Sequence, residues 1–178
     1  MIKDLLKSVA QSRQKFIEAA SGLSFEQSQF KPSVDEWSIA ENIEHMVWAE
    51  MGGINGMWKT LEGIKCNKPI WSGDAIHHGK SIEEIIEKTW KEKEIVPEIA
   101  KPKWFGPVEF WIVALNNCQI ALEALTNALE GFDPEQIIYP HVLSGPLNVI
   151  QRFEFLSFHL DRHRNQIENI KKNPNFPQ

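Results

Sequence analysis

The chain has 178 residues, a formal net charge of −5, 42% apolar residues and 24% charged residues. This length fits one domain with a substantial core, and the composition excludes a disordered chain. The negative charge argues against an affinity for nucleic-acid phosphates. No stretch approaches 18 uninterrupted apolar residues, so no membrane partner is expected. We expect residues 1–178 to form a single domain.

The two cysteines, Cys66 and Cys118, lie far apart without CxxC spacing. This argues against a disulfide framework and against a Cys-ligated zinc site. Reduced thiols are typical of the cytosol, and residues 1–10 carry charges that a signal peptide lacks in its apolar region. We therefore expect a cytoplasmic protein.

Apolar residues recur at helical spacing in four long segments, which predicts four long helices. They are expected over residues 2–20, 38–63 and 107–130, and from about Pro146 to just before Pro174. The second begins with a capping box, because the N-cap residue Ser38 is followed three positions later by Glu41. Gly52, Gly53 and Gly56 in its middle predict either close packing or a kink.

The segments between these helices carry weaker signals. Residues 66–80 are expected to form a long connection, and the pair Ser81 and Glu84 predicts a short helix that ends near Ile95. Residues 136–145 are expected to hold at most a short extended piece and no sheet. The predicted fold class is all-α: a four-helix bundle with a short additional helix.

Three histidines of these helices form a candidate metal site. His159 and His163 are four residues apart, so they lie on one helix face about 6 Å apart along the axis and can turn toward one cation. His163 also falls in the apolar heptad seam of the last helix. A third donor must come from another helix, and His45, at the edge of the apolar stripe of the second helix, is the best candidate.

Polar groups close in sequence extend this candidate site. Glu41 lies one helical turn before His45 and could orient an imidazole or act as a weak fourth ligand. Gln166 follows His163 by three residues and lies close to its face. Trp48 could line a pocket beside the metal.

The remaining histidines fit other positions. His141 stands in a loop before a Gly-Pro pair, where a histidine is more typically a turn or capping group. His77 and His78 lie in a polar segment and are expected to face solvent.

Two sequence patterns resemble those of DinB-like proteins. Residues 37–45, WSIAENIEH, resemble the W-S-x-x-E-x-x-x-H start of that family's second helix. The H-x-x-x-G-P-L pattern from His141 and the H-x-x-x-H-x-x-Q-I pattern from His159 resemble its C-terminal part. The resemblance covers nearly the whole chain and implies a DinB-like bundle with a metal held by His45, His159 and His163. Some relatives, the YfiT-type proteins, look like metal-dependent hydrolases or transferases that activate a low-molecular-weight thiol such as bacillithiol.

The favoured hypothesis is a metal-dependent enzyme, a thiol S-transferase or a hydrolase, although the sequence leaves open whether the protein is an enzyme. Glu41, Gln166 and His141 would then surround the metal or face the substrate. Three imidazoles suit zinc, nickel, iron or copper alike. The alternative is a non-catalytic module that binds a metal or a small ligand, and a third reading is a bundle with packed histidines and no metal.

The expected partners follow from the enzyme hypothesis. They are a small-molecule substrate and a low-molecular-weight thiol cosubstrate, with no nucleic acid and no membrane. A homodimer is an open alternative to a monomer.

Overall fold

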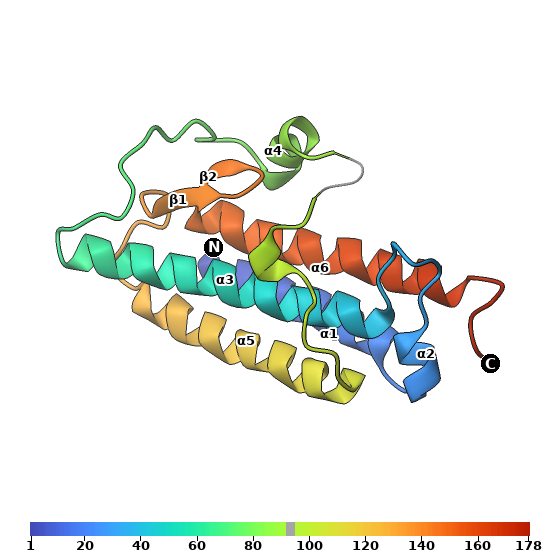
Figure 1. The fold of residues 1–178 in the computed structure, drawn as a ribbon. Helices are drawn as coiled ribbons and strands as arrows, with labels where there is room; N and C mark the ends of the chain where they lie inside the picture. Colours follow the sequence, from blue (N-terminus) through green and yellow to red (C-terminus); the bar gives the residue numbers. More distant parts are fainter. Residues whose placement is uncertain (92–94) are drawn as a thin grey trace.

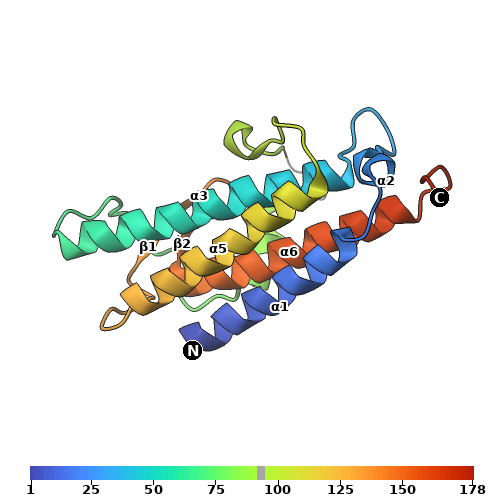
Figure 2. The ribbon, with the colours of Figure 1, turned by 90° about the horizontal axis from the view of Figure 1, so that it is seen from below.

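Four long helices form a bundle in the computed structural model, which describes residues 1–91 and 95–178 (Figure 1). They are α1 (Ile2–Ala20), α3 (Ile39–Lys65), α5 (Val108–Ala128) and α6 (Val149–Lys171). Helices α1 and α6 run in one direction, and α3 and α5 run in the other (Figures 1 and 2). Each helix packs against two others, in the ring order α1, α6, α3, α5. The all-α fold class and its four long helices are confirmed.

The parallel pair α3 and α5 requires a long crossover connection, because the chain must return to the end where α3 began. Residues 66–107 make this crossover and carry α4 (Ile82–Thr89) and the 3-10 helix η1 (Glu98–Ala100). The capping box of Ser81 and Glu84 is present, as predicted. Helix α4 ends earlier than predicted, with Trp90 as its C-cap. The rest of that prediction falls partly on residues 92–94, which lie outside the described residues.

A single large core lies between the four helices. Phe16, Met46, Leu122 and Phe153, one from each long helix, are fully buried. No helix in the described parts of the chain combines the length and the apolar character needed to cross a bilayer.

One ion pair is buried within this core. Arg13 of α1 donates to the carboxylate of Glu50 on α3 and to the amide oxygen of Gln119 on α5. Arg13 and Glu50 are 3% and 0% exposed, so each charge depends on the other for compensation.

Helix α3 starts where the sequence predicted. The Ser38 hydroxyl accepts from the Glu41 amide at 3.1 Å, and the Glu41 carboxylate accepts from the Ser38 amide at 2.8 Å. A short helix that was not predicted, α2 (Phe25–Gln29), precedes it with a capping box of Ser24 and Gln27.

Residues 138–148 form a two-stranded antiparallel sheet, so the expectation that no sheet occurs there was wrong. Strands β1 (Ile138–His141) and β2 (Gly145–Asn148) pair with Pro140 opposite Pro146. The predicted start of the last helix at Pro146 was also wrong. The Asn148 side chain accepts from the Gln151 amide at 2.9 Å, which caps the helix and lets it begin at Val149.

The end of the crossover is tied to α3 by one buried carboxylate. Oε1 of Glu44 accepts from the backbone amides of Lys103 at 2.6 Å and Trp104 at 2.8 Å. Helix η1 packs against α3, and α4 packs against α6. The crossover therefore covers the face of the bundle formed by α3 and α6 (Figure 1).

Of the three glycines in the middle of α3, Gly52, Gly53 and Gly56, only Gly56 packs closely against another element. A Cβ at Gly56 would lie 2.4 to 2.7 Å from the Tyr139 ring, whereas one at Gly52 would have no atom within 4 Å. We expect Gly56→Ala to lower the free energy of unfolding by about 1–3 kcal/mol, because overpacking outweighs the gain in helix propensity. Gly52→Ala is the matched control and should raise it by up to about 1 kcal/mol. Urea unfolding of both variants tests this, and a stabilised Gly56→Ala protein would contradict it.

Candidate metal centre

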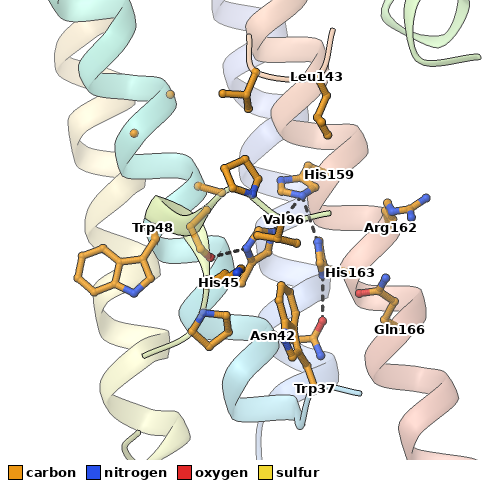
Figure 3. A pocket seen from close by; sticks show the side chains of 18 of the residues that line it. Trp37, Asn42, His45, Trp48, Val96, Leu143, His159, Arg162, His163 and Gln166 are labelled. Atoms are coloured by element: carbon orange, nitrogen blue, oxygen red, sulfur yellow. Dashed lines mark hydrogen bonds between the residues drawn. The ribbon is translucent and has the colours of Figure 1, made fainter. Parts of the chain in front are cut away.

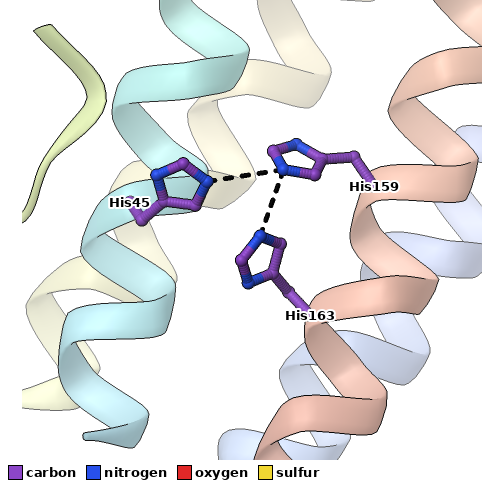
Figure 4. A group of neighbouring side chains, drawn as sticks. All are labelled: His45, His159 and His163. Atoms are coloured by element: carbon purple, nitrogen blue, oxygen red, sulfur yellow. Dashed lines mark hydrogen bonds between the residues drawn. The ribbon is translucent and has the colours of Figure 1, made fainter. Parts of the chain in front are cut away.

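The three histidines predicted from the sequence meet between α3 and α6 (Figure 4). Nε2 of His159 lies 3.4 Å from Nε2 of His45 and 3.1 Å from Nε2 of His163. Two imidazole nitrogens bound to one ion at about 2.0–2.1 Å lie roughly 2.9–3.4 Å apart at octahedral or tetrahedral angles. These two distances fit a single divalent ion, and the ligand atoms of all three histidines lie within 4.8 Å of one another.

Hydrogen bonds on the far sides of two rings hold these nitrogens in place. Nδ1 of His45 donates to the carbonyl oxygen of Ala100 at 2.8 Å, and Nδ1 of His163 donates to Oδ1 of Asn42 at 2.9 Å (Figure 3). The Asn42 amide nitrogen donates to the Ser38 carbonyl oxygen at 2.9 Å, which fixes the direction of the amide. Outer hydrogen bonds of this kind are typical of metal-binding histidines.

These outer bonds decide where the protons are. With Nδ1–H on both His45 and His163, the neutral rings present an Nε2 lone pair toward His159. His159 can donate one Nε2–H to one of them, and the other lone pair then has no donor. A cation at the centre of the three nitrogens would use all three lone pairs. Nδ1 of His159 is buried and has no partner among the described residues.

Burial keeps the three rings neutral. It lowers the pKa of His45, despite the opposing hydrogen bond to Ala100. Burial, reinforced by the neighbouring histidines and by Arg162, lowers the pKa values of His159 and His163 well below their usual value. Neutral imidazoles are the form that binds metal.

The histidines open onto a cavity of about 930 Å³ between α3, α6, the crossover and the β-hairpin. Trp37 and Trp48 line it from the α3 side, as proposed for Trp48 from its position in the sequence. The Trp37 ring lies 4.9 Å from that of His45 and stacks on His163 at 6.3 Å. From α6, Arg162 and Gln166 also line the cavity (Figure 3).

The two polar residues predicted beside the ligands take different positions. Gln166 lines the cavity beside His163. Glu41 is not among the lining residues, because its carboxylate is bound to the Ser38 amide and to Nζ of Lys31 at 3.0 Å. Asn42, the next residue, contacts the ligand instead. Its position in the sequence could have identified it. Asn42 lies one helical turn before His45 and Met46, so its amide can reach the same partner helix.

The other histidines also differ in position. His141 lines the cavity, and its Nδ1 accepts from the amides of Leu143 and Ser144, as expected of a turn residue. His77 was expected to face solvent and does not: it is buried, and its Nε2 pairs with the Ser144 carbonyl oxygen at 2.7 Å. Contacts with the hairpin, which is distant in the sequence, explain this error. The His78 side chain is 70% exposed.

Comparison with known proteins places this chain in a family. A family model of the DinB superfamily matches residues 8–167. The chain belongs to the DinB superfamily. The chain is similar to the uncharacterized protein YuaE of Bacillus subtilis (strain 168). The two are 27% identical over 156 residues, which cover 85% of this chain and 87% of YuaE. No solved structure matches the chain.

The buried histidines of this DinB-superfamily protein should make its metal-free form acid-sensitive. In the unfolded chain each histidine titrates near pH 6.5, whereas in the folded chain the pKa values are lower. Below about pH 6.5 the unfolded chain therefore binds protons that the folded chain excludes. We expect the free energy of unfolding to fall with decreasing pH by up to about 1.4 kcal/mol per pH unit for each such histidine.

Urea unfolding of the metal-free protein between about pH 7.5 and pH 5 measures this slope. Above about pH 6.5 the histidines are neutral in both states, so their contribution should be constant. His163→Gln should reduce the slope by the contribution of one histidine. An unchanged slope in that variant would show that His163 is not buried in the neutral form.

The outer hydrogen bond of His163 gives a second prediction. Asn42→Leu removes the acceptor of the Nδ1–H group and should weaken zinc binding by about 10–100-fold. The neighbouring change Glu41→Gln keeps a residue that can complete the capping box, and should leave zinc affinity within about twofold of the parent. Competition with a chromophoric chelator measures both affinities. Equal zinc affinities for the parent and the Asn42→Leu variant would contradict this role.

Proposed function

We propose that the protein is a metal-dependent enzyme in which His45, His159 and His163 hold one divalent ion beside a substrate cavity. The supporting observation is the number of ligands. Among the described residues, one group of possible metal ligands is close enough to share an ion. It consists of the three histidines, whose ligand atoms lie within 4.8 Å of one another. Three protein ligands with access to a cavity are typical of catalytic rather than closed structural sites.

The reaction class that this site supports best is thiol S-transfer or hydrolysis. A divalent ion, when bound, would lower the pKa of a coordinated thiol or water and so supply a nucleophile at neutral pH. The cavity, with its tryptophans and Phe155, would admit a small-molecule substrate and restrict water. A low-molecular-weight thiol is the proposed cosubstrate for transfer.

The residues of this chain would have separate tasks. Ala100 and Asn42 hold the rings of His45 and His163 in the neutral form that leaves Nε2 free. Gln166 and His141 lie on the cavity lining and would contact the substrate. Zinc, nickel, iron and copper all fit three imidazoles, so the metal is to be identified by experiment. A cytoplasmic location and a homodimer belong to the same proposal, and light scattering of the purified protein tests the latter.

The decisive experiment combines metal analysis with turnover. Protein purified without a histidine tag should contain about one divalent ion per chain, and His163→Ala should lose it. Metal-loaded protein should turn over either bacillithiol with electrophiles or a panel of esters and amides, and His163→Ala should lower that activity by at least about 100-fold. His78→Ala is the matched control, because His78 is exposed and distant from the cluster.

The outcomes separate the candidate functions. Metal binding without turnover in either panel would favour a non-catalytic binding module. A parent protein without metal, and with a melting temperature that is indifferent to chelator at about pH 7.5, would overturn the metal site itself.

A further inference from the structure

A buried cation that has no counter-charge among the described residues lies in the wall of the same cavity. Arg152, in the first turn of α6, is 4% exposed and lines the cavity. One guanidinium nitrogen donates to the Tyr139 carbonyl oxygen at 3.0 Å, and the guanidinium lies over the Tyr139 ring at 3.7 Å. Its Nε is buried and has no partner within the described ranges.

The other deeply buried arginine is compensated in a different way. Arg13 pairs with the carboxylate of Glu50. None of the ion pairs among residues 1–91 and 95–178 includes Arg152. Burial lowers the pKa of Arg152 to about 10, so it is still a cation at neutral pH. A buried charge without a counter-charge is costly, and its place in a cavity wall indicates that the negative charge comes from a ligand.

A hydrogen-bond donor of fixed direction lies beside it. Nδ1 of His141 accepts from the amides of Leu143 at 3.3 Å and Ser144 at 3.1 Å, so it carries no proton. Burial, and then the charge of Arg152, lowers the pKa of His141 to about 3, which keeps the ring neutral. Its one proton is therefore on Nε2, on the ring edge away from the turn. The ring stacks on Trp90 with an interplanar angle of 13°.

We propose that Arg152 and the Nε2–H group of His141 form a subsite for a carboxylate of the substrate. A carboxylate offers one negative charge and two acceptor oxygens, which match one cation and one N–H donor. Trp90 and Phe155, which also line the cavity, would contact an apolar body of the ligand. This deepens the proposed function, on which it rests for the role of the cavity: the substrate is a carboxylate with an apolar body, and His141 is a hydrogen-bond donor rather than a base.

The acidic groups of the cavity do not occupy this subsite. Asp35 and Glu36 line the cavity from the loop before α3, and this loop and the β-hairpin lie at opposite ends of the α3–α6 face (Figure 1). Among residues 1–91 and 95–178, no acidic residue that lines the cavity therefore competes with an anionic ligand at Arg152.

The test compares two ligands of similar shape, one with a carboxylate and one with a neutral carboxamide in the same place. Phenylacetate and phenylacetamide are titrated calorimetrically into protein from which metal has been removed with a chelating resin. We expect phenylacetate to bind at least about tenfold more tightly. Arg152→Gln should remove this preference, and Arg152→Lys should retain it at reduced affinity. Arg164→Gln is the matched control on the same helix and should behave as the parent, because Arg164 pairs with Asp161 at the surface.

Two further measurements separate ligand binding from a structural role. Arg152→Met should not lower the melting temperature of the ligand-free protein, because it removes an uncompensated charge. His141→Asn keeps an acceptor for the two turn amides but lacks the Nε2–H donor, and should weaken phenylacetate binding by about five- to tenfold.

Equal affinities for the two ligands, or a preference that persists in Arg152→Gln, would overturn the subsite. So would a preference seen only after zinc is added, because the carboxylate would then be bound to the metal. Failure of the protein to bind any metal would contradict the proposed metal-dependent function. It would not change the preference for phenylacetate measured with metal-free protein.

Discussion

Three imidazole nitrogens point toward one another in a buried space, and two of them are held in the unprotonated state by hydrogen bonds on the far sides of their rings. Much of the structure around the site serves this arrangement. Asn42 is held by the start of α3, and Ala100 is brought to His45 by the crossover. Burial removes the alternative of protonating the rings. The packing of α3 against α6 thus buries the three rings and, by burying them, keeps them neutral.

The helices and the ligand triad could be predicted because their signals are local or periodic. The capping box at Ser38 and the heptad seam around His163 depend on residues within a few turns, and the structure has both. The hairpin could not be predicted in this way, because its short strands contain Pro140 and Pro146 and have no alternating pattern. Partners such as Ala100 and Asn42 depend on which elements meet in space, which no local pattern states.

The cavity joins two kinds of polar group that the fold treats differently. Around the three histidines, protons and hydrogen bonds are arranged so that lone pairs are left over. The positive charge of Arg152 has no counter-charge among the described residues. The core pair of Arg13 and Glu50 shows that the same bundle can compensate a buried charge internally. Both unsatisfied groups are at the cavity wall, where a ligand can complete them.

The crossover has two parts that differ in how they are bonded to the bundle. Residues 98–104 are fixed, since Ala100 orients a metal ligand and the amides of Lys103 and Trp104 are bound to Glu44. The hydrogen bonds of residues 67–75 reach only as far as the end of α3 and their own turns. Insertions and deletions among relatives should therefore collect in the second segment, since loop length there costs little free energy. Evolution could in this way change the length of the crossover while the geometry of the three histidines stays the same.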